Sequence, residues 1–242
     1  VKKLKSIFVA TPTALLKVPS AIDSLSQQQY ISKNAHNLLS AELELTLATK
    51  RFDYLRYHLY ETEARWKYYT PDKEFYHLTD GITRKHSACW FLPSFSLAIE
   101  ANLEDTYQRS LQKNSGSDFE QKLEIAKTQY KGIELEVALC QLANRFSTYL
   151  TSPNFFAILP AVDSLMQESS SQPALYKFFK NQHNKIVALK PGNKAPNFSL
   201  PNRNGNLVSL ESLKGKVVLL TFWGTWCPPC LSNVPKYIEI QE

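Results

Sequence analysis

The sequence predicts a mainly α N-terminal domain, residues 1–188, followed by a shorter α/β segment, residues 189–242. Two observations indicate this division. Before position 188, long stretches lack Gly and Pro and carry apolar residues at helical spacing. After it, short runs of β-forming residues alternate with turns. With 242 residues, of which 43% are hydrophobic, the chain is long enough to bury a sizeable core.

The first long helix is predicted within Ala41–Tyr69, which contains neither Gly nor Pro. Charged residues alternate there with aromatic ones, and we call the aromatic residues from Phe52 to Tyr69 the aromatic stripe. We expect half of the stripe to pack within a helical bundle while the remaining Tyr hydroxyls reach water. The alternative is an exposed aromatic surface that binds a substrate.

Further helices follow in order, separated by turn signals. Asp80-Gly81 marks a turn, and Asn114–Asp118 is a polar loop. Apolar residues at helical spacing predict a buried helix over Ile133–Phe146. Ser152-Pro153 is expected to cap the next helix, and the last helix is expected from Ala174 to about Val187.

Strand-like runs begin after the linker Lys190–Asn193. Phe198–Leu200 and Leu207–Leu210 flank a turn at Asn202–Gly205 and predict a β-hairpin. The continuous apolar run Val217–Trp223 predicts a strand that is buried on both faces of a sheet.

The pair Cys227-Pro228-Pro229-Cys230 follows this strand and predicts thiol–disulfide chemistry. Such chemistry needs an accessible thiolate, a second thiol nearby and a local field that favours ionised sulfur. Unpaired N–H groups and partial positive charge at a helix N-terminus would lower the pKa of the Cys227 thiol, so we assign it as the nucleophile. Cys230, one turn later, is expected to lie beneath it and to resolve the mixed disulfide.

The neighbours of the cysteines are expected to tune this site. Pro228 and Pro229 have no N–H to donate to a thiolate, so the spacer should affect the redox potential. Trp226, directly before Cys227, is assigned to the same tuning group. Pro235 lies far enough into the following helix that it should kink it.

Other uses of the cysteines stay open. Cys227–Cys230 could be a purely structural bridge. A zinc site would need a second cysteine pair or two histidines at ligand spacing, and the sequence has neither, so we expect no metal and no other cofactor. Cys89 and Cys140 are expected to be buried thiols, with a bridge between them as the alternative in an oxidising compartment.

Spaced residues around the cysteine pair form a recognisable pattern. They are Gly192-x-x-Ala195-Pro196-x-Phe198-x-Leu200, Gly205, Val208-x-Leu210, Leu213-Lys214-Gly215-Lys216 and Phe222-Trp223-x-x-Trp226-Cys227-Pro228-Pro229-Cys230, with Pro235. In these residues the segment 190–242 resembles the TlpA/ResA-like thiol–disulfide oxidoreductases of the redoxin group. The resemblance implies the first half of an α/β thioredoxin-like fold and an enzyme that exchanges disulfides.

The resemblance also implies partners and a location. The partners would be protein thiols or disulfides and an upstream redox protein. The location would be periplasmic or otherwise extracytoplasmic, with a possible membrane tether outside the given chain. Larger relatives carry an extra N-terminal domain, which the helical region would match.

Two departures from the family pattern are visible. Asn233 stands where many members have a Glu that helps to manage the active-site proton. The chain also stops at Glu242, before the cis-proline loop of such a fold, so we expect a fragment that is poorly active alone. Its unpaired strand edges would borrow strands from a partner or be stabilised by the helical domain.

Other functions are disfavoured or left as alternatives. A peroxiredoxin would have Thr three positions before its cysteine, where this chain has Gly224. The net charge of +6 is scattered along the chain, which gives no reason to expect nucleic-acid binding. No apolar run reaches the roughly 20 residues of a membrane helix. The main alternative is that the helical region is a partner-binding module with an accessory redox domain.

Overall fold

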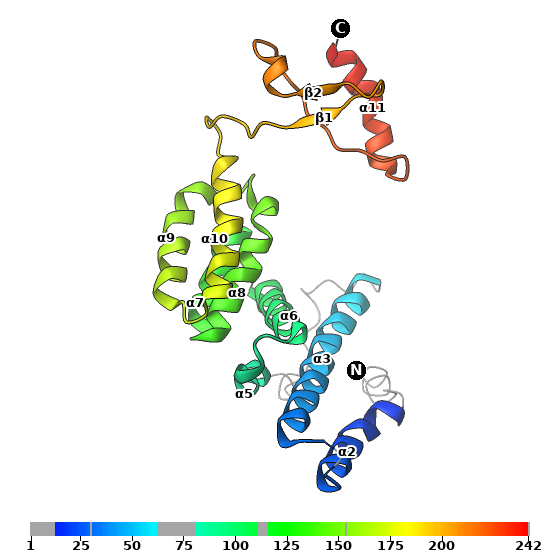
Figure 1. Ribbon diagram of the computed structural model, residues 1–242, viewed down its shortest axis with the longest axis vertical. Coiled ribbons are helices and arrows are strands. Elements are labelled where there is room, and N and C mark those ends of the chain that lie inside the picture. The colour runs from blue at the N-terminus through cyan, green and yellow to red at the C-terminus, as the bar shows by residue number, and fades with distance from the viewer. Residues whose placement is uncertain (1–12, 30, 62–80, 111–115, 153, 242) are drawn as a thin grey trace. The chain divides into compact units, whose positions relative to one another are not determined.

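The computed structural model describes residues 13–29, 31–61, 81–110, 116–152 and 154–241 (Figure 1). Within these residues the chain is mostly helical, with one two-stranded sheet. It divides into two compact units, residues 1–192 and residues 193–242. We call them the helical unit and the C-terminal unit and describe each by itself.

The described part of the helical unit consists of α-helices and two short 3₁₀ turns. The helices are α2 (Thr13–Gln27), α3 (Lys33–Glu61), α5 (Ile82–Lys85), α6 (Pro93–Ser110), α7 (Asp118–Gln129), α8 (Ile133–Asn144), α9 (Phe155–Ser169) and α10 (Pro173–Ala188), with 3₁₀ turns η1 (Ser87–Cys89) and η2 (Phe146–Tyr149). Helix α8 packs against α6, α7, α9 and α10, and α6 also packs against α3. Helix α8 is therefore the centre of this unit.

The core of the helical unit is a cluster of aromatic rings around α8. Phe119, Phe146, Phe155 and Phe179 are fully buried. Their ring centroids lie 5.0–6.0 Å apart in edge-to-face contacts. This geometry adds to the stabilisation that burial of the rings provides. The predicted buried helix is confirmed as α8, although the helix ends at Asn144 and Phe146 belongs to η2.

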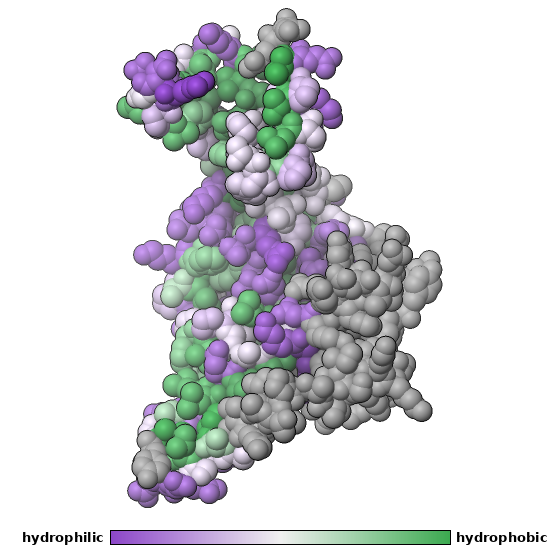
Figure 2. Space-filling model, turned by 90° about the vertical axis from the view of Figure 1, so that its right-hand side faces the viewer, coloured by the Kyte–Doolittle hydropathy of each residue, from purple (hydrophilic) through white to green (hydrophobic). Residues whose placement is uncertain are grey.

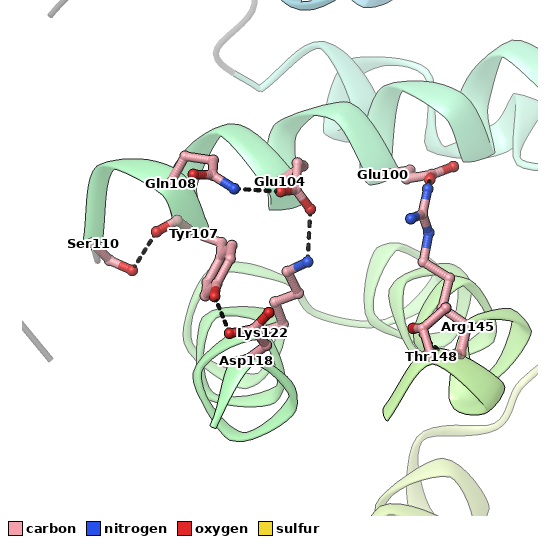
Figure 3. Close-up of polar contacts among 9 residues, drawn as sticks. All are labelled: Glu100, Glu104, Tyr107, Gln108, Ser110, Asp118, Lys122, Arg145 and Thr148. Carbon is pink, nitrogen blue, oxygen red and sulfur yellow. Dashed lines mark hydrogen bonds and ion pairs between the residues drawn. The ribbon is translucent and has the colours of Figure 1, made fainter. Parts of the chain in front are cut away.

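Polar contacts join α6 to its neighbours over the same core (Figure 3). Lys122 Nζ on α7 lies 2.7 Å from Glu104 Oε2 on α6 and 4.4 Å from the centre of the Tyr107 ring. The Tyr107 hydroxyl donates to Asp118. The Lys122 ammonium thus has a carboxylate and an aromatic face as partners, which makes its burial tolerable.

Local signals explain where the helices begin. Ser117 and Glu120 form a capping box at the start of α7, in which each side chain accepts from the other's backbone N–H. The predicted cap at Ser152 is wrong, because α9 is preceded by Asn154 in a left-handed conformation with φ 61°. Asn tolerates this conformation better than most residues, so the turn is completed there.

A buried carboxylate holds the start of α10. Glu136 on α8 is fully buried. It accepts hydrogen bonds from the backbone N–H groups of Ser171 and Gln172 at 2.8 and 3.1 Å. These donors satisfy the carboxylate and fix the loop before Pro173. The predicted last helix is confirmed, since α10 spans Pro173–Ala188.

The aromatic stripe is described only in part. The helix predicted over Ala41–Tyr69 is confirmed as far as Glu61, where α3 ends. Phe52 is buried, as expected for the packed half of the stripe. The side chains from Tyr54 to Tyr69 lie outside the described residues.

The C-terminal unit begins with the predicted hairpin. Strands β1 (Ser199–Pro201) and β2 (Leu207–Ser209) pair antiparallel, with Leu200 opposite Val208. Asn202 Oδ1 accepts from two backbone N–H groups of the turn at 2.9 and 3.0 Å. Gly205 completes the turn with φ 80°, which a residue without a side chain adopts without strain. A 3₁₀ turn, η3 (Glu211–Leu213), and helix α11 (Pro228–Gln241) follow.

The predicted buried strand Val217–Trp223 is not a strand in the structure. The segment has no regular secondary structure, and no backbone–backbone hydrogen bond joins it to another described residue. Six of its seven side chains are exposed, including Phe222 at 87%. A strand exists only through hydrogen bonds to a neighbour, and β1 and β2 pair with each other. Sequence pattern alone does not supply that partner.

Among the described helices, none combines the length and the apolar character that crossing a bilayer requires. The longest, α3, carries charged residues throughout.

Candidate functional site

The cysteines of the C-terminal unit form a disulfide at the start of α11. Cys227 directly precedes the helix and Cys230 is its third residue, with their Cα atoms 5.3 Å apart. Both are partly exposed. The position of Cys230 beneath Cys227 stays a prediction. None of the described side chains from Asn193 to Ile240 is buried.

The backbone N–H groups at this helix start are absent or already bonded. Pro228 and Pro229 have none. The N–H of Cys227 donates to the Gly224 carbonyl at 3.0 Å, and that of Cys230 donates to the Cys227 carbonyl at 3.0 Å. The unpaired N–H groups predicted beside the Cys227 sulfur are therefore not present from Cys227 to Cys230. What remains is the partial positive charge of the helix end, which no acidic residue in the first turn offsets.

Trp226 lies folded over the turn that leads into the disulfide. Its side chain is 86% exposed. A Cβ atom on Gly224 would lie only 2.8 Å from the indole Nε1 and 2.9 Å from Cε2. The indole therefore occupies the space that a side chain at position 224 would need. In the sequence, Gly224 was considered only because a peroxiredoxin would have Thr at this position. Its role in leaving room for the indole of Trp226 depends on the geometry of the turn, which no sequence motif indicates.

The residue in the place of the family's Glu is tied to the helix itself. Asn233 Nδ2 donates to the Pro229 carbonyl at 3.0 Å. Further along, Pro235 lies inside α11 and offers no N–H to the Leu231 carbonyl one turn earlier. Asn233 therefore holds the first turn of the helix, and a neutral amide cannot exchange a proton with the cysteines as a carboxylate would.

The remaining two cysteines are free thiols in the helical unit. Cys140 is buried on α8 and lies 3.5 Å from the Leu175 carbonyl. Burial, with the charge of Glu136, raises the pKa of its thiol to about 12. Cys89 is only partly buried, contrary to expectation. The alternative of a Cys89–Cys140 bridge does not hold in this structure, and the raised pKa makes Cys140 a poor nucleophile.

The helical unit contains a cavity of about 590 Å³. Phe52 of the aromatic stripe lines it, together with Arg84 and Arg109. Arg84 lies 3.6 Å from Glu134, and Arg109 lies 2.8 Å from Asp105. Both acidic partners are buried, so the charges of the two guanidinium groups are balanced within the protein. In the described part of the chain, no group of three or more His, Cys, Asp or Glu side chains could hold a metal ion.

Comparison with known proteins places the disulfide in a family context. The Redoxin family model matches residues 190–242. We call these residues, which the family model matches, the redoxin segment. The predicted resemblance to ResA-like proteins is thereby confirmed for this part of the chain.

Relatives of the redoxin segment carry matching names. The thioredoxin-like protein YneN of Bacillus subtilis is 39% identical over 67 residues, which is 28% of this chain and 39% of the relative. The thiol-disulfide oxidoreductase ResA of the same organism is 50% identical over 48 residues, 20% of this chain and 27% of the relative. ResA of Halalkalibacterium halodurans is 40% identical over 60 residues, 25% and 34% of the two chains.

The matches are partial on both sides. The chain spans less than two fifths of the length of these relatives. No solved structure matches the chain significantly. The comparisons therefore concern the redoxin segment and leave most of the helical unit uncovered.

Proposed function

We propose that this protein is a thiol–disulfide oxidoreductase that exchanges disulfides with protein substrates through Cys227 and Cys230. The observation that carries the proposal is a partly exposed disulfide at the N-terminus of α11, within a redoxin segment. Relatives named thiol-disulfide oxidoreductases support it. Exposure matters because a substrate sulfur must approach in line with the bond that it breaks.

The exchange begins when a thiolate of a reduced substrate attacks Cys227 Sγ. The Cys227–Cys230 bond breaks and Cys230 leaves as a thiolate, so a mixed disulfide joins Cys227 to the substrate. The second substrate thiolate attacks the substrate sulfur and releases Cys227. Two electrons have then passed from the substrate to the cysteine pair. In the opposite direction, the reduced pair would reduce a substrate disulfide and an upstream dithiol protein would restore it.

The surroundings supply the electrostatics and the contact surface. The helix end favours the Cys227 thiolate over the thiol, because its partial positive charge is not offset by a nearby acid. Pro228 and Pro229 have no N–H group to donate to the thiolate. The Cys227 thiolate is therefore stabilised less than it would be if the two residues between the cysteines had free N–H groups. The exposed Trp226 would contact an incoming protein substrate. A compartment outside the cytoplasm suits the disulfide form.

Single-cysteine variants test the proposal. Cys230→Ser should trap a mixed disulfide between Cys227 and a disulfide-containing protein such as insulin, because no resolving thiol remains. Cys227→Ser should trap none. Non-reducing electrophoresis and mass spectrometry measure the adduct, and Cys89→Ser serves as a matched control outside the segment. Equal trapping by both variants, or no alkylation of Cys227 in the reduced protein, would refute the assignment.

A second candidate function rests on the 590 Å³ cavity of the helical unit. In this alternative, the helices bind a partner and the redoxin segment is accessory. The double variant Cys227→Ser/Cys230→Ser separates the two, since it abolishes exchange and leaves the cavity unchanged. Full biological activity of the double variant would favour the binding module.

A further inference from the structure

The turn between β1 and β2 consists of Asn202–Asn206, which are three asparagines, an arginine and a glycine. A turn of this composition belongs in water, because burying its backbone and amide groups without partners would be costly. Figure 2 shows hydrophilic residues on the surface of the C-terminal unit, at the top of the view. Asn204 is the only asparagine of the sequence that precedes a glycine. The turn therefore sets an asparagine side chain beside a backbone nitrogen whose own residue has no side chain to shield it.

We propose that Asn204 is a site of spontaneous deamidation and that the hydrogen bonds of the turn hold the reaction back. The backbone nitrogen of Gly205 attacks Asn204 Cγ, the side-chain amide leaves as ammonia, and a succinimide ring joins the two residues. Water then opens the ring at either of its carbonyls. The products are aspartate and isoaspartate, and in the latter the backbone runs through the former side chain. Water is the one co-reactant that this chemistry consumes.

The Asn204 side chain is available for this reaction. Within the described residues its Oδ1 and Nδ2 atoms make no hydrogen bond. Other asparagines of the C-terminal unit are held by their side-chain oxygens. Asn197 Oδ1 accepts from the Glu211 N–H at 3.1 Å, and Asn202 Oδ1 accepts from two N–H groups of the turn. The reaction takes place between neighbouring residues and uses no surface beyond the turn itself.

The hydrogen bonds of the turn oppose ring closure. The Gly205 N–H donates to the Asn202 carbonyl at 2.9 Å. A succinimide nitrogen carries no hydrogen, so this bond must break before the ring forms. Asn202 Oδ1 accepts from the N–H groups of Asn204 and Asn206 at 2.9 and 3.0 Å, which fixes the backbone on both sides of the reacting pair. Asn202 is therefore the residue that protects Asn204.

The reaction would change the hairpin. Strands β1 and β2 are short, with Leu200 opposite Val208, and the length of the turn sets this register. Isoaspartate lengthens the backbone of the turn by one carbon atom, and both products add a negative charge. Deamidation thus acts on the pairing of β1 with β2 and is separate from disulfide exchange at Cys227.

Peptide mapping of the full 242-residue chain during incubation in mildly alkaline buffer tests the proposal. Mass spectrometry should show at Asn204 the mass gain of an amide replaced by an acid, and an isoaspartyl methyltransferase should label part of the product. Asn206 is the internal control, since it lies in the same turn but precedes Leu207, whose side chain hinders attack. It should stay intact while Asn204 reacts.

Two variants at Asn202 test the protection. Asn202→Ala removes the side-chain acceptor and should speed deamidation of Asn204 roughly two- to tenfold, as expected from the net contribution of a hydrogen bond. Asn202→Asp keeps an acceptor oxygen in the same place and should leave the reaction slow. Unfolding in urea should speed it at least as much as Asn202→Ala does. Deamidation of Asn206 as fast as that of Asn204, or equal rates in the unmodified chain, in Asn202→Ala and in urea, would overturn the proposal.

Discussion

The two units of this protein use their apolar residues in opposite ways. In the helical unit, Phe119, Phe146 and Phe155 are buried against one another, and the buried Lys122 forms an ion pair with Glu104. In the C-terminal unit, comparable side chains such as Phe222 and Trp226 are exposed. The sequence contains strong apolar patterns in both parts. What differs is whether the described chain itself supplies the surface that covers them.

This difference in burial also determines which cysteines can react. The helical unit holds a free thiol, Cys140, but burial raises the pKa of this group and makes it inert. The C-terminal unit places its disulfide at a partly exposed helix end. A redox pair must meet its substrate, so the open unit is the one that can react.

The largest expected effect comes from the matched substitutions Phe155→Ala and Phe222→Ala. Phe155 is 1% exposed and packs edge to face on Phe119 and Phe146. Its removal leaves a cavity and should lower the free energy of unfolding by about 3–5 kcal/mol. Phe222 is 87% exposed, so its truncation should change stability by less than about 0.5 kcal/mol.

Urea denaturation followed by circular dichroism measures the change that each substitution causes. If Phe222→Ala lowered the free energy of unfolding as much as Phe155→Ala does, the contrast between buried apolar side chains in the helical unit and exposed ones in the C-terminal unit would be contradicted.

The pH dependence of stability sharpens the contrast within the helical unit. Burial alone would raise the pKa of Glu104, but hydrogen bonds from Lys122 and Gln108 and the charges of Lys122 and Arg145 outweigh it, so the pKa is lowered from 4.5. The unfolded chain therefore binds this proton more readily than the folded one. The resulting stabilisation is complete above pH 4.5 and is lost as the pH falls through the lowered folded value.

Lys122→Met should lower stability at pH 7 by about 1.5–3 kcal/mol, because a charge-assisted hydrogen bond is lost. The difference from the unmodified chain should shrink as the pH falls below 4.5, where Glu104 becomes neutral. Urea denaturation at pH 7 and pH 3 measures this. Lys127→Met is the control on the same helix, since its pair with Glu124 is exposed and should contribute less than about 0.5 kcal/mol. A pH-independent loss at Lys122 would refute the link to Glu104.

Much of the fold follows from local sequence signals. The buried helix α8, the last helix α10 and the hairpin around Asn202–Gly205 were predictable, because spacing, capping and turn residues act within a few positions. The segment Val217–Trp223 was not, because pairing depends on residues distant in the chain or outside it. Apolar content indicates that a segment should be covered, without indicating what covers it.

The candidate site divides in the same way. The cysteine spacing predicted the disulfide-forming pair and its place at the helix start. The hydrogen bonds that occupy the N–H groups of Cys227 and Cys230 were not predictable, because they depend on how the turn from Gly224 closes. The same turn geometry gives Gly224 a role that no sequence pattern indicated.

The smallest expected effect tests this role. Gly224→Ala places a methyl group 2.8 Å from the indole Nε1 of Trp226, so the exposed ring must move. We expect a stability change within about 0.5 kcal/mol, because both residues lie at the surface. The difference in tryptophan fluorescence between the oxidised and reduced protein should change, since a displaced indole lies differently beside the disulfide. The same substitution in a Trp226→Phe background is the control and should leave the signal of the other tryptophans unaltered. An equal fluorescence change in both backgrounds would mean that Gly224 determines the conformation of the turn and that the space it leaves for the Trp226 indole is not what matters.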